Sequence, residues 1–488
     1  MKDKGIKKNI LINTLYQILL VIIPIITAPY VSRVLGSEGI GIYSYTTSIV
    51  LYFTLFGALG TVSYGTREIS KNRDNIKERS KLFWEVELLT IFTSIISIIL
   101  WLIVVIIYKQ YQIYLLILTL NLINTMLDIS WFYSGIEEFK YTVTKNAICK
   151  IIGVICIFVF VRTKDDLFIY FLINGLTTLF GTISMWFYIK KFVIKIDKSE
   201  IKVLRHLKET FIYFIPTIAT SIYTVLDKTL IGIITKDVNQ NGYYEQANKI
   251  IGIMESLTFT SVNIVLESRM SYLFAQNKYD EIQKRIDKSM KYILFMGIGI
   301  CFGILAISKK FVPLFFGNGF QESVELLNLM SPLVFIIGIS NCLGSQFYTP
   351  AGFRKESAKY IIIGSIVNLI CNLLLIPKWG SRGAVIGSII AESIISFLYV
   401  LNSKGYMSFT KIIKFSYKYV IAGIIMMIVV LYIDQITKTN AIFVMLEVFI
   451  GITIYIISLL LMRDKFIFEL KEILTNIIRK KGKNESEI

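Results

Sequence analysis

The stretch "GIYSYTTSI", residues 41–49, has a related copy further along the chain, "GYYEQANKI", residues 242–250. These two stretches are 201 residues apart. Two more related pairs follow in the same order, at offsets of 205–206 and 214–215 residues: "KNRDNIKER" (71–79) with "QNKYDEIQKR" (276–285), and "FYSGIEEFK" (132–140) with "FYTPAGFR" (347–354). Three ordered matches with a slowly drifting offset indicate an internal duplication.

The apolar composition around these repeats predicts a membrane protein. Hydrophobic residues make up 55% of the 488 positions, and the mean hydropathy is +0.64. A helix needs about 20 apolar residues to cross the hydrocarbon core, and runs of that length recur along the chain. They form continuous blocks rather than short alternating strands, which excludes an outer-membrane barrel. We therefore predict an all-α polytopic membrane protein with about 14 transmembrane helices.

The repeat unit covers six of these predicted spans. An even number of spans returns the chain to the same side, so the two halves are parallel repeats. We expect two six-helix bundles with two helices appended, and a substrate site between the bundles. The predicted divisions are a first bundle at 1–190, a basic cytoplasmic linker at 191–208, a second bundle at 209–402, two additional helices at 403–462 and a basic cytoplasmic tail at 463–488.

The net charge of +18 is unevenly distributed over the predicted loops. With the N-terminus inside, the cytoplasmic segments carry 37 Lys and Arg and the outer loops carry 10. By the positive-inside rule this predicts that both termini are cytoplasmic. The positive charge is thus an orientation signal, and nucleic-acid binding is not expected.

Several kinds of chemistry find no support in the sequence. The five cysteines are scattered through apolar stretches without paired spacing, and the single histidine, His206, lies in a basic loop. They predict neither a disulfide framework nor a metal site. The chain also lacks a P-loop, so direct drive by ATP is not indicated. We expect no cofactor, no metal and no enzymatic activity.

Asp227 and Lys228 interrupt the apolar stretch "SIYTVLDKTLIGII", residues 221–234. A charge at the centre of a spanning helix costs roughly 2.5–3.5 kcal/mol. Neighbouring positions diverge by about 100° on a helix, so these side chains face different surroundings. Either Lys228 extends to the outer headgroups while Asp227 pairs with another helix, or both line a cavity between the bundles.

Other charged residues also fall in or near predicted spans. Glu245 and Lys249 are four residues apart and could pair on one helix face, whereas Glu255 lies deeper and is a candidate proton or cation carrier. Further charges lie at the ends of spans, at Arg33, Asp128, Lys150 and Arg269. The aromatic residues 131–133 are placed like an interfacial belt.

Six motifs resemble the Wzx-type polysaccharide flippases, which share a superfamily with the lipid II flippases and the multidrug and toxin extrusion (MATE) transporters. The motifs are "SRVLGSEGIGIYSY" (32–45), "ISWFYSGIEEFK" (129–140), "YTVLDKTLIG" (223–232), "NGYYEQANKI" (241–250), "SYLFAQNKYDEI" (271–282) and "NLLLIPKWGSRGAVIGSIIAE" (372–392). The resemblance implies a MATE-like fold of two bundles around a central cavity. It also implies a location in the bacterial cytoplasmic membrane.

The activity implied by this resemblance is translocation of undecaprenyl-pyrophosphate-linked oligosaccharide repeat units to the outer leaflet, with alternating access between the bundles. A polymerase and a chain-length regulator would be partners, and proton or sodium the coupling ion. The resemblance assigns basic cavity residues to the anionic head, and the matching candidates are Arg33, Lys228, Lys249 and Arg269. The acidic partners or coupling residues would be Asp128, Asp227 and Glu255.

Two other functions are compatible with parts of this pattern. A cation-coupled drug antiporter of the MATE type would share the architecture, but such proteins resemble one another in using a carboxylate in the first span. Here that span, "NILINTLYQILLVIIPIITAPY" (9–30), has no acidic residue. A membrane-embedded polysaccharide polymerase or ligase tends to carry a large outer loop, whereas the longest outer loop predicted here covers only residues 309–323.

Overall fold

The computed structural model describes residues 2–469, and every regular element in that range is a helix. The predicted all-α class is therefore confirmed. Within this range the structure describes all side chains except those of residues 2–15, 17, 139, 141, 216, 219, 220, 222–224, 261, 264, 265 and 268.

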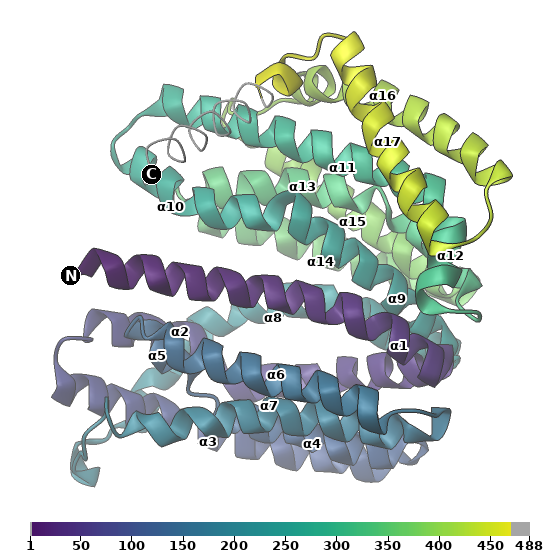
Figure 1. Ribbon diagram of the computed structural model, residues 1–488. Helices are drawn as coiled ribbons and strands as arrows, with labels where there is room; N and C mark the ends of the chain where they lie inside the picture. The colour runs from purple at the N-terminus through teal and green to yellow at the C-terminus, as the bar shows by residue number, and fades with distance from the viewer. Residues whose placement is uncertain (1, 470–488) are drawn as a thin grey trace, which may run out of the picture. The chain divides into compact units, whose positions relative to one another are not determined.

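The first of two compact units comprises Met1–Glu245 and Ile376–Ser381. In this unit α3, α4, α7 and α6 pack one against the next, and α1 contacts all four (Figure 1). Its helices are α1 (Lys2–Ala58), α2 (Thr61–Lys71), α3 (Ile76–Ile107), α4 (Gln112–Leu127), α5 (Ser130–Gly135), α6 (Phe139–Phe160), α7 (Leu167–Ile189), α8 (Leu207–Thr235) and the first part of α9 (Val238–Glu255).

The second unit comprises Gln246–Leu375 and residues from Arg382 onward. Its central helix is α11, which packs against α10, α12, α13, α16 and α17. The helices are the remainder of α9, then α10 (Ser261–Ala275), α11 (Tyr279–Phe316), α12 (Gln321–Met330), α13 (Leu333–Leu343), α14 (Arg354–Trp379), α15 (Ser381–Leu401), α16 (Phe409–Ile436) and α17 (Ala441–Leu461).

The boundary between the units does not coincide with the boundary of the repeat. Helix α8 packs against α1 and α2, so contacts place it in the first unit, whereas the sequence repeat places residue 209 onward in the second bundle. The predicted divisions follow the repeat and stay a prediction. Most of the predicted tail, from residue 470 on, lies outside the described residues.

Helix α1 is two helices joined at Gly36. This residue has φ 68° and ψ −177°, a conformation that glycine adopts without steric cost. The sequence predicted separate spans before and after this point, and the break at Gly36 divides α1 accordingly. A side chain at Gly36 would strain the backbone where the chain changes direction.

The first repeated stretch packs against its own copy. A Cβ atom added to Gly41 would lie 1.8 Å from the Val238 carbonyl oxygen, and one added to Gly242 would lie 2.1 Å from the Ser37 carbonyl oxygen. Residues 238 and 242 are the counterparts of 37 and 41 at the offset of 201, so each contact is the copy of the other. The backbones of α1 and α9 touch around a local twofold relation, and only glycine permits that approach.

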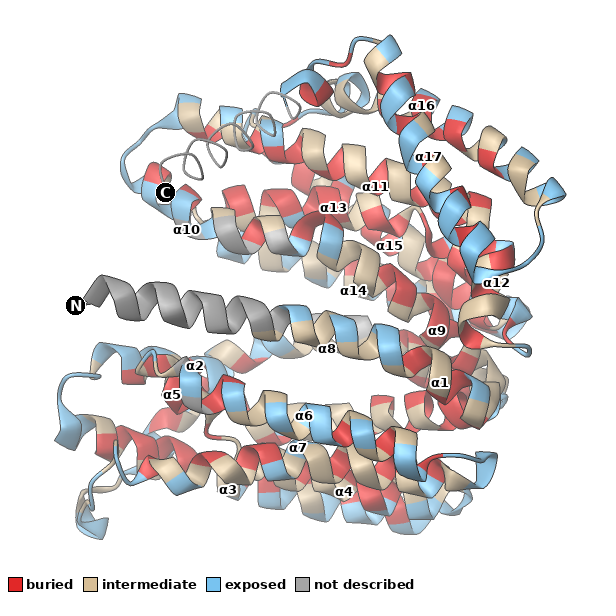
Figure 2. Cartoon of the chain, viewed as in Figure 1, coloured by how far each residue is buried: buried red, intermediate tan, exposed pale blue. Residues whose placement is uncertain are grey.

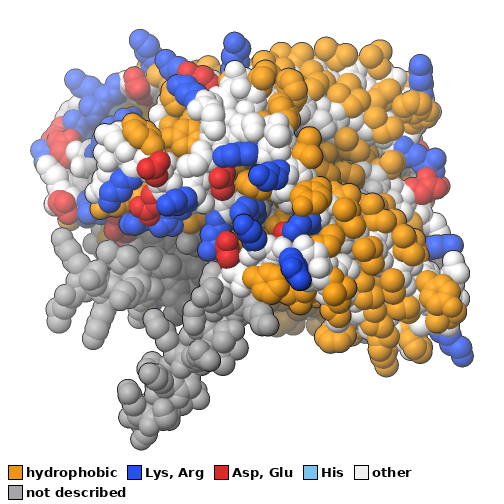
Figure 3. All heavy atoms as spheres, turned by 90° about the horizontal axis from the view of Figure 1, so that it is seen from above, with side chains coloured by type: hydrophobic (Ala, Val, Ile, Leu, Met, Phe, Trp, Pro, Cys, Tyr) orange, Lys and Arg blue, Asp and Glu red, His pale blue; other side chains and the backbone are white. Residues whose placement is uncertain are grey.

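The surface has the composition of a chain surrounded by lipid. Eleven helices of the described part are long and apolar enough to cross a membrane, and the first of these runs, Ile18–Lys71, contains the break at Gly36. Large apolar side chains are exposed along α3, α6, α16 and α17 (Figure 2). Figure 3 shows one face on which hydrophobic side chains form a broad field on the right, while most charged side chains gather on the left and across the middle. The protein is a multi-pass membrane protein.

Helices α16 and α17 are joined to α11 by a buried ammonium group, that of Lys310. Its Nζ atom lies 3.0 Å from Asp434 Oδ1 and 3.1 Å from Glu447 Oε1, and it also donates to Thr437 Oγ1 at 2.8 Å. Backbone carbonyl oxygens of Asp434 and Thr437 complete the shell. Glu447 is fully buried. The ion pair between Lys310 and Glu447 therefore joins α17 to α11 through charges that are removed from water.

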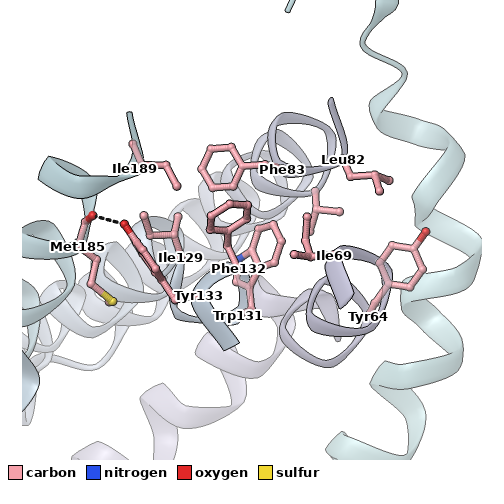
Figure 4. Close-up of a cluster of buried hydrophobic side chains, with 11 residues drawn as sticks. Tyr64, Ile69, Leu82, Phe83, Ile129, Trp131, Phe132, Tyr133, Met185 and Ile189 are labelled. Atoms are coloured by element: carbon pink, nitrogen blue, oxygen red, sulfur yellow. Dashed lines mark hydrogen bonds between the residues drawn. The ribbon is translucent and has the colours of Figure 1, made fainter. Parts of the chain in front are cut away.

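The expectation of an aromatic belt at residues 131–133 is wrong. Trp131, Phe132 and Tyr133 are at most 1% exposed and pack with Phe83 and Ile69 in the core of the first unit (Figure 4). The short helix α5 carries all three rings inward, and Tyr133 donates a hydrogen bond to the Met185 carbonyl oxygen at 2.7 Å. Three adjacent bulky residues cannot share one face of a long helix, but a single turn enclosed by α2, α3 and α7 buries them all.

Candidate functional site

A polar cavity of about 310 Å³ lies inside the first unit, between α1, α4, α6 and α7. Glycines make room for its polar walls. A Cβ atom on Gly181 would lie 2.7 Å from Asn146 Oδ1, and one on Gly153 would lie 2.6 Å from Thr177 Oγ1. The close approach of α6 and α7 at this wall therefore depends on the absence of side chains at Gly153 and Gly181.

The walls of this cavity carry amide and hydroxyl groups on helices that are otherwise apolar. Asn124, Asn146 and Asn174 line it together with several threonines. Part of this polarity is satisfied internally, since Thr182 donates to Asn124 Oδ1 and Asn174 donates to the Tyr170 carbonyl oxygen at 2.8 Å. Polar groups at membrane depth are costly and are usually retained for a function.

The cavity contains one charge of each sign. Lys150 on α6 lines it, and no ion pair or hydrogen bond of its ammonium group is found within the described part of the chain. Asp128, at the end of α4, lines it too, and Asp128 Oδ1 accepts a hydrogen bond from the Ser130 N–H at 2.9 Å. Asp128 also lines a second cavity of about 180 Å³ between α1, α2, α3 and α4. An unpaired ammonium beside amides and hydroxyls suits a ligand that carries phosphate and sugar groups.

Asp227 and Lys228 do face different neighbours. Lys228 forms an ion pair with Glu245 of α9, at 2.7 Å, and Glu245 accepts a hydrogen bond from Ser44 of α1 at 2.9 Å. Asp227 is buried and accepts a hydrogen bond from the Tyr244 hydroxyl at 2.7 Å. The expected partner helix for Asp227 is thus α9, and the two charges join α8 to α9 and α1 within the first unit.

The remaining predicted residues are distributed over both units. Arg33 on α1 is exposed. Lys249, suggested as the partner of Glu245, lies on the part of α9 that belongs to the second unit, and the ion pair of Glu245 shown by the structure is with Lys228. Arg269 is exposed, 3.7 Å from Glu281, and it packs over the Tyr272 ring.

Glu255 ends α9 just before a π-helical turn, Ser256–Thr260, and the carboxylate of Glu392 acts on it electrostatically. Neither of the two cavities described above is lined by the four predicted cations, Arg33, Lys228, Lys249 and Arg269. Of the predicted acidic residues, Asp128 lines both.

The sequence interpretation missed a buried contact made by the only histidine. His206 is 4% exposed; its Nε2 atom lies 2.9 Å from Glu85 Oε2, and its Nδ1 atom is hydrogen-bonded to the Tyr64 hydroxyl at 2.6 Å. Glu85 also accepts from the Lys202 N–H at 2.7 Å and pairs with Arg205. The end of the predicted linker is thereby fixed to α3. The signal available in the sequence was Glu85, an acidic residue where an apolar run begins.

A family comparison identifies the chain. The family model described as "Polysaccharide biosynthesis protein" matches residues 6–274, more than half of the sequence. The chain belongs to this family. The resemblance to polysaccharide flippases drawn from the motifs is thereby confirmed, and the matched region contains every helix that lines the two cavities.

One curated relative covers most of this chain, and another covers about half of it. It is 24% identical over 412 residues to a protein named "Putative O-antigen transporter" from Escherichia coli K12, which covers 82% of this chain and 98% of that protein. It is 23% identical over 236 residues to the "Probable low-salt glycan biosynthesis flippase Agl15" of Haloferax volcanii, which covers 47% of this chain and 48% of that one.

Solved structures share the fold. "Lipid II flippase MurJ, inward closed conformation" matches with a TM-score of 0.73 and 17% identity, covering 93% of this chain and 99% of that one. The multidrug transporter DinF-BH matches with a TM-score of 0.57 and 14% identity, covering 82% and 94%. At these identities the likeness establishes the MATE-like fold, which agrees with the expected fold class.

Proposed function

We propose that the protein is a flippase that moves lipid-linked oligosaccharide repeat units across the cytoplasmic membrane of a bacterium for cell-surface polysaccharide biosynthesis. The relatives are named as O-antigen transporters and as flippases, not as catalysts. Transfer between leaflets breaks no covalent bond, so no catalytic residue is required. The substrate would be the undecaprenyl-pyrophosphate-linked unit, and alternating access the mode of transport.

The observation that carries the proposal is the polar cavity with Lys150 inside membrane-spanning helices. A sugar diphosphate head cannot enter hydrocarbon, because its hydroxyl groups and charges would lose water without new partners. Asn146, Asn174 and the threonines beside them offer donors and acceptors for hydroxyl groups. The Lys150 ammonium offers a counter-charge for phosphate. The lipid tail can remain in the bilayer meanwhile.

The candidates from the sequence complete this proposal. We assign Arg33, Lys228, Lys249 and Arg269 to later contacts with the anionic head along its route, with Asp128, Asp227 and Glu255 as acidic partners or coupling groups. Both termini would lie in the cytoplasm, and the polymerase and chain-length regulator would act on the product outside. A proton or sodium gradient would drive the transport.

The test is transport of a labelled lipid-linked repeat unit in proteoliposomes. Lys150→Met should lower the initial rate roughly tenfold, because a charge-assisted hydrogen bond to phosphate contributes about 1.5–3 kcal/mol. Lys145→Met is the matched control on the same helix, since its ammonium packs over the Tyr188 ring and does not line the cavity. Equal rates in the two variants would exclude Lys150 from head-group binding. A wild-type protein without any transport of the labelled lipid would refute the function.

A further inference from the structure

The segment between α7 and α8 has a basic surface that borders neither of the two described cavities. Residues 187–208, here called the linker surface, contain seven Lys and Arg but only two acidic residues. Both acidic residues already have partners. Glu200 Oε1 lies 3.1 Å from Lys77 Nζ of α3, and Asp197 Oδ1 accepts a hydrogen bond from the Ser199 N–H at 3.2 Å. The positive charge of the linker surface is therefore not neutralised by its own carboxylates.

Six lysines of the linker surface are exposed, and no ion pair of their ammonium groups is found within the described part of the chain. They are Lys190, Lys191, Lys195, Lys198, Lys202 and Lys208. The buried carboxylate beside the segment, Glu85, is occupied by Arg205 and His206. The six ammonium groups are thus available to anions from outside the chain.

Large apolar side chains are exposed among these lysines. Phe187 is 78% exposed, Ile194 is 42% exposed and Leu204 is 70% exposed. Orientation of the chain in the membrane requires only the positive charges, so the positive-inside rule does not account for these apolar residues. Lysines interspersed with exposed apolar side chains are typical of segments that lie on a membrane surface.

The backbone of the linker surface is fixed to α3. The Ile194 N–H donates a hydrogen bond to Ser80 Oγ at 3.0 Å, and the Lys202 N–H donates to Glu85 Oε1 at 2.7 Å. Because the spanning helix α7 ends at Ile189, the segment starts where a helix leaves the hydrocarbon and enters the headgroup layer. A segment held in this way loses less conformational entropy on binding than a free loop does.

The exposed apolar side chains favour a lipid ligand over a soluble one. A free phosphate or a nucleotide would pair with the lysines and leave Phe187 and Leu204 in water. A phospholipid supplies both a phosphate group for the ammonium groups and an acyl region for the apolar side chains. Each lysine near an anionic membrane surface strengthens binding by a factor of roughly five. Both parts of the linker surface therefore find a partner in an anionic bilayer.

We propose that the linker surface binds the phosphate headgroups of anionic phospholipids in the adjacent leaflet of the membrane. The ammonium groups of Lys195, Lys198 and Lys202 pair with phosphodiester groups, and Leu204 enters the boundary between headgroups and acyl chains. This contact attaches α3 and the start of α8 to the lipid surface at a place outside the spanning helices. It requires no transported substrate, so it can be tested independently of the proposed function.

The first measurement is native mass spectrometry of the full chain released from detergent micelles and titrated with phosphatidylglycerol or with phosphatidylcholine. Wild type should bind phosphatidylglycerol more tightly than phosphatidylcholine. The combined substitution Lys195→Gln, Lys198→Gln and Lys202→Gln should weaken the binding of phosphatidylglycerol at least roughly fivefold, the contribution of one lysine at an anionic surface. The three lysines are exposed, so their substitution should leave folding intact.

The matched control removes the same charge from the second unit. Lys278→Gln, Lys284→Gln and Lys288→Gln change three exposed lysines together and should keep the wild-type affinity for phosphatidylglycerol. An equal loss of affinity in the two triple variants would show that lipid binding follows net charge alone, and it would overturn the site. Equal affinity of the wild type for the two lipids would overturn it as well.

The second measurement separates bilayer lipid from soluble phosphate. Trypsin should cleave the linker surface several-fold more slowly in phosphatidylglycerol vesicles than in phosphatidylcholine vesicles, because headgroups cover its lysines. Glycerol 3-phosphate added to the phosphatidylcholine vesicles should give no protection. Cleavage after the exposed Lys278 is the internal control and should proceed equally fast in both vesicles. Protection by glycerol 3-phosphate, equal cleavage of the linker surface in both lipids, or equal slowing at Lys278 overturns the assignment to a lipid surface.

Discussion

Replacement of Lys310 by methionine should destabilise the second unit by about 3 kcal/mol. The change removes the ammonium group that contacts Asp434, Thr437 and Glu447 and leaves a side chain of similar length. Loss of one member of a buried ion pair costs about 3–5 kcal/mol, because the other charge stays desolvated. The lower end applies here, since Glu447 keeps a hydrogen bond from the Thr437 hydroxyl at 2.6 Å.

Unfolding in mixed detergent micelles, followed by intrinsic tryptophan fluorescence, measures this loss. Lys309→Met is the matched control: that residue is adjacent and exposed, and its substitution should change the unfolding free energy by less than about 0.5 kcal/mol. The double variant Lys310→Met with Glu447→Leu should recover about 2 kcal/mol relative to Lys310→Met alone, because the more deeply buried of the two carboxylates left without the ammonium group is removed. Equal stability of the Lys310 and Lys309 variants would refute the interpretation of this contact as a buried ion pair.

Three further predictions test contacts of the first unit, with Gly252 of the second unit as the control for the first of them. Gly41→Ala should lower the free energy of unfolding by about 3 kcal/mol or prevent folding, because its Cβ atom would lie 1.8 Å from a carbonyl oxygen. Gly252→Ala has open space at its Cβ position and should be neutral or slightly stabilising in the same unfolding assay. Lys228→Met should cost about 2 kcal/mol, and Glu245→Gln in the same chain should recover part of it; no recovery would argue against the ion pair. Glu85→Leu should release the linker and make it several-fold more sensitive to trypsin in native membranes, and an unchanged cleavage rate would show that the linker is held by other contacts.

Much of the fold could be predicted because membrane insertion requires long apolar blocks, and such blocks can be recognised in a sequence without knowing how the helices pack. The repeat at 41–49 and 242–250 proved informative beyond its length, since the two copies contact each other reciprocally through Gly41 and Gly242. The boundary between compact units was not accessible in the same way. The boundary depends on which helices α8 packs against. A spanning helix exposes apolar residues both to other helices and to lipid, so its sequence does not show which neighbours it contacts.

The candidate site was predicted less completely. Counting charges in apolar runs found Asp128 and Asp227 but favoured cations that neither described cavity contains. Lys150 was assigned to a helix end, because sequence spacing does not reveal which side chain lacks a partner after packing. The prediction that residues 131–133 form an interfacial belt was wrong for a related reason. An interfacial ring and a core ring have the same sequence context when a short helix follows a long one.

The contact between His206 and Glu85 has a practical consequence for experiments. The chain contains a single histidine, and that side chain sits where the linker meets α3. Its imidazole resonances in a nuclear magnetic resonance spectrum would therefore be free of overlap from any other histidine. They would report attachment or release of the segment between the halves, during turnover and without an introduced label.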